Sequence, residues 1–360
     1  MDVYPVSSPV EGNRLFITIT GVGNTNVSSP VAFDTGSAGL TLYAPNIFPS
    51  NIVTRDGGFV FPAGQTSLTY QGITVTNQQG YRKYGGANGR TQTGNIGYAQ
   101  VTFGDSRGSL TTDVMPILFY YQVTATATGV LEAPQVQQGW FGVNTNPGQI
   151  TVPNSVAPSG GFPACDPNTT GTCYAVSVLK FLHYASSVDA GFMLTPTQLQ
   201  PCDMSVAASC TPASALTVGL TPALVTGFNT LSLTCPPVNY TGPSIISNYQ
   251  VCAADIPGTL ISVSGTNTGS LTAQVLFDSG NPGVSLNIPP GIAFPAALIA
   301  GDTVQVTTAS GFVYSYTAGT GVNDSVVTLN STAGQSVIGI GYFTTNSFFI
   351  DFTSGTEGWK

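Results

Sequence analysis

Short runs of alternating apolar and polar residues recur along most of the chain. Because successive side chains of a β-strand point to opposite faces, this period of two indicates strands that bury one face. The runs are bounded by turn formers, chiefly Gly, Pro and Asn. The pattern predicts strands over residues 15–20, 66–76, 98–103, 114–124, 259–264, 271–277, 303–308, 312–316 and 348–352. It is typical of a mostly β protein and not of an alternating βαβ fold.

One segment departs from this period and follows a helical one instead. Five apolar residues stand at i, i+3, i+4, i+7 and i+10, namely Ala175, Val178, Leu179, Leu182 and Ala185. Such spacing places them on one helical face and predicts a single amphipathic helix that ends near Gly191. His183 lies off this face without a Ser or Cys nucleophile context, so we interpret it as an exposed helix residue.

A sequence motif occurs twice. The stretch from Phe33 to Pro45, FDTGSAGLTLYAP, aligns without gaps to the stretch from Phe277 to Pro289, FDSGNPGVSLNIP. The Phe, the Asp, two Gly, a Leu and the Pro coincide. A hydrophobic-hydrophobic-Gly element follows each copy, WFG at residues 140–142 and VIG at residues 337–339. The chain is therefore predicted to contain two versions of one β unit, forming two domains.

The paired loops offer a specific chemistry if Asp34 and Asp278 meet across a pseudo-twofold axis. Two carboxylates in contact do not both ionise readily, so one holds a proton while the other stays charged. The charged member can take a proton from a water molecule while the protonated member hydrogen-bonds to the carbonyl that the water attacks. The sequence thus indicates amide hydrolysis without a covalent intermediate.

The residues that flank each aspartate suit this role. Gly36 and Gly280 permit a tight turn and a close approach of the backbone. The hydroxyls of Thr35 and Ser279 can connect one loop to the other. Ser37 is placed to orient the carboxylate of Asp34.

These motifs resemble the pepsin-like aspartic proteases. The resemblance rests on FDTGS at 33–37, FDSG at 277–280, the two Gly elements and the ending VIGIGYFTTNSFFIDF at 337–352. It implies a mostly β, bilobal pepsin-like acid protease fold with two pseudo-twofold-related β lobes and a few short helices. The first lobe, with the first Asp loop and the flap, would span 1–185, and the second lobe, with the second Asp loop, 186–360.

The family resemblance also implies a flap, a hairpin that covers the cleft with a tyrosine. The segment KYGGANG at 83–89 lies at about the expected distance after the first loop, so Tyr84 and Gly85 are the flap candidates. Tyr81 and Tyr98 are competing candidates for the tyrosine.

The sequence departs from the family pattern in two places that affect the site. Asn281, followed by Pro282, stands where the family usually has Thr or Ser, so the support of Asp278 must differ, although an amide can still donate a hydrogen bond. The tryptophan that commonly partners the flap tyrosine is absent, and residues 41–43 are Thr-Leu-Tyr.

Composition excludes several other functions. Charged residues make up 7% of the chain and the net charge is −8, so nucleic acid is not an expected partner. The chain has a single histidine, which argues against serine and cysteine hydrolases, and it has no H-E-x-x-H motif, which argues against zinc hydrolases. No metal and no other cofactor is expected, nor is a membrane span, because no apolar run is long enough.

Six cysteines form three couples close in sequence, and we interpret them as the disulfides Cys165–Cys173, Cys202–Cys210 and Cys235–Cys252, although six cysteines allow fifteen connectivities. Disulfides indicate an oxidising compartment, so we expect a secreted protein, extracellular or periplasmic, whose signal peptide is not part of this sequence.

The leading hypothesis is a secreted, monomeric aspartic endopeptidase acting on extended peptide or protein substrates, with apolar side chains preferred beside the scissile bond. The alternative is a catalytically silent binding or inhibitory protein of the same fold, motivated by Asn281 and the absent tryptophan. A more distant alternative is a glycosidase, which would need its two carboxylates roughly 5–10 Å apart.

Overall fold

The computed structural model describes residues 1–8, 12–85, 89–133, 139–146, 148–152, 172–204, 209–235, 252–254, 256–289, 291–319 and 335–360. Most of these residues lie in β-strands, and helices are few and short, as the alternating pattern predicts. Every predicted strand run overlaps an observed strand. Run 66–76 covers two strands that are joined by a turn at residues 71–72, and run 98–103 covers the ends of two strands that Gln100 separates.

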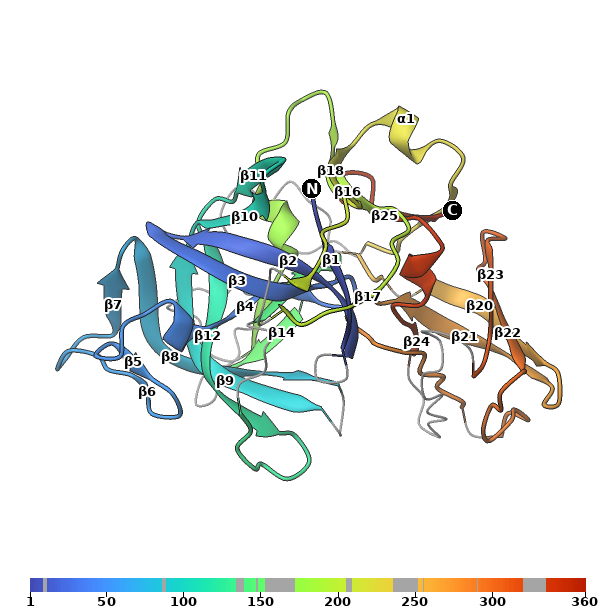
Figure 1. The fold of residues 1–360 in the computed structure, drawn as a ribbon, viewed down its shortest axis with the longest axis horizontal. Coiled ribbons are helices and arrows are strands. Elements are labelled where there is room, and N and C mark those ends of the chain that lie inside the picture. The colour runs from blue at the N-terminus through green and yellow to red at the C-terminus, as the bar shows by residue number, and fades with distance from the viewer. Residues whose placement is uncertain are drawn as a thin grey trace.

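The largest sheet in the described part of the chain has 14 strands and occupies the blue-to-green half of the molecule (Figure 1). Its main path runs β11-β10-β2-β3-β13-β4-β12-β9-β8-β14-β15, with β1, β7 and β17 attached at the side. The strands are β1 (Tyr4–Ser8), β2 (Gly12–Val22), β3 (Thr25–Asp34), β4 (Ala38–Tyr43), β7 (Ser67–Tyr70), β8 (Ile73–Tyr84), β9 (Arg90–Ala99), β10 (Val101–Asp105), β11 (Gly108–Thr111), β12 (Met115–Ala125), β13 (Gly139–Val143), β14 (Gly148–Thr151), β15 (Thr172–Ala175) and β17 (Gln200–Pro201).

Two five-stranded sheets make up most of the rest. One has the order β18-β16-β25-β26-β19, with β16 (Asp189–Leu194), β18 (Leu216–Leu220), β19 (Asn229–Ser232), β25 (Phe348–Asp351) and β26 (Thr356–Trp359). The other has the order β23-β22-β20-β21-β24, with β20 (Ile256–Ser264), β21 (Gly269–Phe277), β22 (Thr303–Thr307), β23 (Val313–Thr317) and β24 (Ser336–Ile338). A small hairpin pairs β5 (Val53–Thr54) with β6 (Gly58–Phe59).

The amphipathic helix expected over residues 175–185 is not formed. A single 3-10 turn, η3 (Val178–Phe181), is present, and β16 then runs through Gly191. Lys180 and Phe181, which lie off the predicted apolar face, are buried, whereas Ala185, which lies on it, is exposed. Because the segment is enclosed on several sides by neighbouring strands, packing overrides the helical period. The other described helices are α1 (Pro222–Val225), η1 (Ala44–Asn46) and η7 (Tyr342–Thr344).

The internal repeat of the sequence is also a repeat of strand pairing. β3, which leads into the first Asp loop, lies parallel to β13, with Phe33 opposite Phe141. β21, which leads into the second Asp loop, lies parallel to β24, with Phe277 opposite Ile338. Each Asp-bearing strand is thus paired with the strand that carries the hydrophobic-hydrophobic-Gly element.

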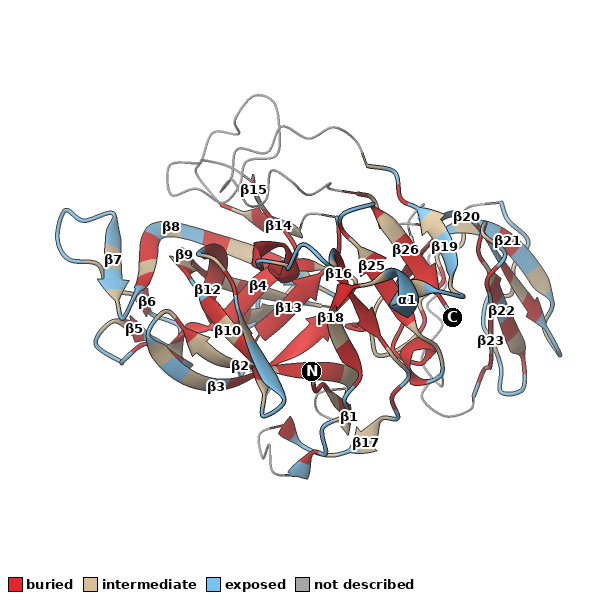
Figure 2. Ribbon diagram, turned by 90° about the horizontal axis from the view of Figure 1, so that it is seen from above, coloured by how far each residue is buried: buried red, intermediate tan, exposed pale blue. Residues whose placement is uncertain are grey.

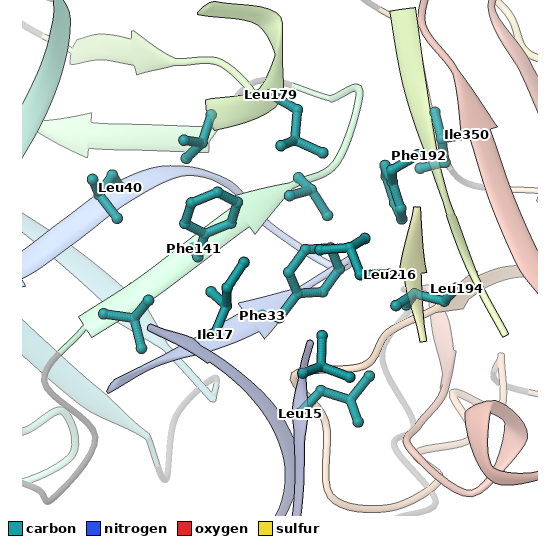
Figure 3. Packing of buried hydrophobic residues seen from close by; sticks show 14 of the residues in the cluster. Leu15, Ile17, Phe33, Leu40, Phe141, Leu179, Phe192, Leu194, Leu216 and Ile350 are labelled. Atoms are coloured by element: carbon teal, nitrogen blue, oxygen red, sulfur yellow. The ribbon is translucent and has the colours of Figure 1, made fainter. Parts of the chain in front are cut away.

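The phenylalanine before each aspartate anchors its strand in the core. Phe33 packs between Phe141 and Phe192, at ring-centroid distances of 5.9 and 5.6 Å, and so connects the large sheet to the sheet of β16 (Figure 3). Phe277 packs on Tyr342 at 4.6 Å. Buried residues concentrate on the central strands (Figure 2), and full burial of one such side chain stabilises the fold by roughly 1.5–3 kcal/mol. The strand ends that carry the aspartates are therefore firmly positioned.

Two of the three predicted disulfides, Cys202–Cys210 and Cys235–Cys252, are present. The third, Cys165–Cys173, lies partly outside the described residues, because Cys165 is not among them. His183 is exposed, as expected, and contacts Asp113 at 2.9 Å. Within the described ranges, no helix combines the length and the apolar character required to cross a bilayer.

Candidate active site

The two repeated loops begin where two strands end. Asp34 is the last residue of β3 and lies opposite Gly142 of β13. Asp278 directly follows β21, and its backbone N–H donates to the carbonyl oxygen of Ile338 in β24 (2.9 Å). Both aspartates are thus held at the end of a parallel strand pair.

Four hydrogen bonds cross between the loops. The backbone N–H of Ser279 donates to Thr35 Oγ1 (2.9 Å), and the hydroxyl of Thr35 donates to the carbonyl oxygen of Phe277 (2.8 Å). In the reciprocal set, the N–H of Thr35 donates to Ser279 Oγ (3.1 Å), and the hydroxyl of Ser279 donates to the carbonyl oxygen of Phe33 (2.7 Å). Both side chains are fully buried. The predicted connection between the loops is present, and it joins residues 244 positions apart.

The glycines of each loop make room for the carboxyl group of the other. A Cβ atom added to Gly36 would overlap the carboxyl group of Asp278. A Cβ atom added to Gly280 would lie 2.7 Å from Cγ of Asp34, which is also too close. Because only glycine lacks this atom, each loop packs against the opposing carboxyl group without a side chain in between.

The two carboxyl groups differ in their hydrogen bonds. Asp34 Oδ1 accepts from the N–H groups of Gly36 (2.8 Å) and Ser37 (3.1 Å), and Oδ2 accepts from the hydroxyl of Ser37 (2.5 Å). Asp278 Oδ1 accepts from the N–H of Gly280 (2.7 Å). The carboxyl group of Asp34 thus accepts three hydrogen bonds within its own loop, and that of Asp278 accepts one.

Burial raises the pKa of Asp278 well above 3.8, and the charge of Asp34 and a hydrogen bond to its carboxyl group raise it further. The N–H of Gly280 and the charge of Arg14 oppose this shift. The pair therefore holds one proton over a range of pH, with Asp278 as the protonated member and Asp34 as the charged one.

This proton makes stability depend on pH. The unfolded Asp278 carboxyl ionises near 3.8, whereas the folded one keeps its proton to higher pH, so between these two values the folded state binds more protons. We expect the free energy of unfolding to fall as the pH rises through this interval, and Asp278→Asn to remove that part of the fall. Denaturant unfolding of the unmodified protein and of the variant, from about pH 3 to about pH 7, measures this pH dependence of the free energy of unfolding.

Asp56→Asn, at an exposed position that does not line the site, is the matched control for loss of a carboxylate. An Asp278→Asn variant with the pH dependence of the unmodified protein would contradict the assignment of the proton to Asp278.

Two further residues at the loops were not identified from the sequence. Arg14 Nε donates to the carbonyl oxygen of Gly280 (3.0 Å), which brings its charge close to Asp278. Asn144 Nδ2 donates to the carbonyl oxygen of Thr35 (2.7 Å). Arg14 lies in the N-terminal part of the chain, far from either motif, and nothing in its local sequence marks it. Asn144 lies two residues after the first Gly element, and this position is the signal in the sequence that could have identified it as a residue of the site.

The side chain of Asn281 does not support the carboxyl group of Asp278 as expected. Its Nδ2 donates to the carbonyl oxygen of Gly283 (2.9 Å), and its backbone carbonyl accepts from the N–H of Ile340 (2.9 Å). Asn281 thus stabilises the loop and touches the dyad through its backbone, where its N–H donates to the carbonyl oxygen of Asp278 (3.2 Å).

The two carboxyl groups open into a cleft of about 490 Å³. Tyr84 and Gly85, at the end of the hairpin formed by β8 and β9, line this cleft, whereas Tyr81 and Tyr98 do not. The geometry therefore selects Tyr84 among the three tyrosines. The tip of this hairpin, residues 86–88, lies outside the described residues.

A tryptophan does partner Tyr84, but from an unexpected element. The ring of Tyr84 stacks on that of Trp140 in β13, with centroids 4.6 Å apart and planes at 14°. Trp140 belongs to the first Gly element, which the sequence analysis noted, but its contact with Tyr84 was not predicted. Burial raises the pKa of Tyr84 to about 12, so the hydroxyl stays neutral under acidic and neutral conditions.

Comparisons with known proteins add no identification. No protein-family model matches the chain, and no curated protein sequence matches it either. The function therefore has to be inferred from the geometry of the site.

Proposed function

We propose that this protein is an aspartic endopeptidase that hydrolyses peptide bonds with a water molecule activated by Asp34 and Asp278. The observation that carries the proposal is the contact between the carboxyl groups of the buried Asp34 and the half-buried Asp278 on twinned loops, with the pKa of Asp278 strongly raised. Such a pair is an acid and a base in one place, which is the requirement for attack of water on an amide.

The roles follow from the two environments. Asp34, which accepts three hydrogen bonds, is the base that takes a proton from the water as its oxygen bonds to the carbonyl carbon. Asp278 gives its proton to the carbonyl oxygen, so the tetrahedral intermediate is a neutral diol. Asp34 then gives the proton it took from the water to the amide nitrogen, while the charged Asp278 takes a proton from one hydroxyl of the diol. The C–N bond breaks, a carboxylic acid and an amine leave, and the pair again holds one proton on Asp278.

The proposal includes a bilobal, pepsin-like arrangement with lobes over residues 1–185 and 186–360. Its support is the twofold repetition of the Asp strand and its parallel Gly-element strand. Substrate would bind as an extended strand in the cleft below the β8–β9 hairpin, with Tyr84 covering it and apolar side chains beside the scissile bond. The two disulfides support secretion into an oxidising compartment.

The geometry disfavours the glycosidase alternative. A hydrogen bond joins the carboxyl groups of Asp34 and Asp278, whereas glycosidases keep theirs roughly 5–10 Å apart. The Asn281 side chain, part of the motivation for a silent binding protein, hydrogen-bonds to the carbonyl oxygen of Gly283 within its own loop. The stacking of Tyr84 on Trp140 removes the other part.

One assay separates enzyme from silent binder. The protein is incubated with an unfolded protein substrate from about pH 3 to about pH 7, where a coupled dyad passes through its singly protonated state. We expect cleavage with an acidic optimum and inhibition by a peptide whose scissile amide is replaced by a hydroxyl-bearing mimic of the tetrahedral intermediate. No cleavage at any pH by folded protein, with the mimic still bound, would favour the binder.

A further inference from the structure

The positive charges of the chain are concentrated in the cleft. Only eight Lys and Arg residues are present in a protein of net charge −8. Four of them line the cleft, and apart from the dyad no described Asp or Glu does. These four are Arg14, Arg82, Lys83 and Arg90. With one proton on the dyad, the wall of the cleft is positive while the rest of the molecule is negative.

Two of these cations frame an aromatic pair. The guanidinium of Arg14 lies 4.9 Å from the ring centroid of Trp140, Trp140 stacks on Tyr84, and the guanidinium of Arg82 lies 4.9 Å from the ring of Tyr84. Aromatic faces attract cations, so the stack holds both guanidinium groups in place. All four side chains line the cleft, which distributes fixed positive charge along it.

Arg82 and Lys83 are not neutralised by a carboxylate within the described residues. Arg82 is buried, and of its five N–H donors one hydrogen bond is made, from Nη1 to the carbonyl oxygen of Ala38 (2.6 Å). Lys83 is exposed, with its ammonium 5.7 Å from the ring of Tyr81. Arg90, in contrast, forms an ion pair with Glu132.

From this arrangement we propose that the cleft selects peptides with an Asp or Glu side chain in the bound segment, outside the two positions beside the scissile bond. The inference rests on the proposed endopeptidase function and adds the substrate class. A carboxylate in a cleft lined by Arg14, Arg82, Lys83 and Arg90 gains charge attraction, whereas the matching amide does not. Arg is well suited to the task, since its fork of donors fits a carboxylate.

The preference depends on pH in a defined way. The titratable and charged groups that face the cleft are Asp34, Asp278, Tyr84, Tyr120 and the four cations. The two tyrosines stay neutral, because burial raises the pKa of each. A substrate Glu ionises near pH 4.3, so the preference appears as the pH rises through that value.

The test uses octapeptides that share an apolar pair at the scissile bond and differ by a single Glu or Gln at each other position in turn. The readout is the ratio of kcat/KM for the Glu and Gln peptides. We expect a ratio of about 3 to 10 for at least one position near pH 5.5 and low salt. The ratio should approach one near pH 3 and in about 0.5 M salt, where charges are protonated or screened.

Two variants change the charge of the cleft in opposite directions. Lys83→Gln, at an exposed position, should lower the ratio about twofold, and Glu132→Gln, which removes the acidic partner of Arg90, should raise it by a similar factor. Lys360→Gln removes the same charge outside the cleft, near Phe228, and is the matched control with an unchanged ratio.

The outcomes separate this inference from the proposed function. Cleavage of both peptides with a ratio at or below one at every position, or a ratio that neither cleft variant changes, would overturn the inference while leaving the protease intact. Cleavage of neither peptide by folded protein would overturn the protease, and the inference is then decided by binding. Tighter binding of the Glu peptide at low salt supports it, and equal binding refutes it.

Discussion

Asp34→Asn and Asp278→Asn should each lower kcat by at least about 10³-fold and leave the fold intact. The reason is that the two carboxyl groups share one proton and act as a unit, so removing either leaves an acid without a base or a base without an acid. An amide has the same shape as a carboxyl group and can still accept from the N–H groups of the loops. Steady-state kinetics on a fluorogenic peptide, with circular dichroism of each variant, provide the measurement.

The matched control is Asp56→Asn. Asp56 is an exposed turn residue with a φ of 65°, a conformation that Asn also adopts, and it does not line the cleft. It should retain the activity of the unmodified protein. Either dyad variant with more than about a tenth of that activity would show that other groups perform the hydrolysis.

Thr35→Val and Ser279→Ala should each destabilise the protein by about 2–4 kcal/mol and also lower kcat. Each substitution leaves two buried backbone groups without partners: the N–H of Ser279 and the carbonyl of Phe277 for Thr35→Val, and the reciprocal pair for Ser279→Ala. The loss should extend to activity because the same hydrogen bonds fix the relative position of the two carboxyl groups. Denaturant unfolding and kinetics on the folded fraction measure the two effects separately.

Thr76→Val is the control that separates a loss of stability from a change in the relative position of the two carboxyl groups. Thr76 is also buried, and its hydroxyl donates to the carbonyl oxygen of Ile96 (2.8 Å), far from the loops in sequence and outside the cleft lining. It should lose stability but keep the kcat of its folded fraction, whereas Thr35→Ser should largely preserve both properties because it keeps the hydroxyl. A Thr35→Val variant with normal kcat would show that the crossing hydrogen bonds serve folding alone.

The sequence predicted the strands well, because one face of most strands is buried and the other is not. The strand over residues 271–277 is an example, since its alternation matches the observed β21. β4 and β13 were not predicted, because nearly all their residues are buried and no alternation marks them. The helix over 175–185 was wrong because residues 178–182 are all buried, whichever helical face they would occupy, and the spacing of the apolar ones among them mimics a helical face.

At the site, the two repeated motifs predicted the hydrogen bonds between the loops, but not the residues that other strands bring to them. Thr35, Ser37 and Ser279 make the hydrogen bonds expected of them. Arg14 and the pairing of Trp140 with Tyr84 depend on how distant strands are placed, which local sequence does not encode. Asn281 was assigned to the wrong partner, because its choice between Asp278 and Gly283 is decided by the geometry of a turn.

The crossing hydrogen bonds also determine when the proposed activity first exists during synthesis. Asp34 is translated 244 residues before Asp278, and β25, which pairs with β16, comes later still. A chain that is still being made therefore carries a solitary Asp34 with no second carboxyl group to share a proton. The proposed hydrolytic activity can begin only after the second loop has been synthesised and has docked against the first.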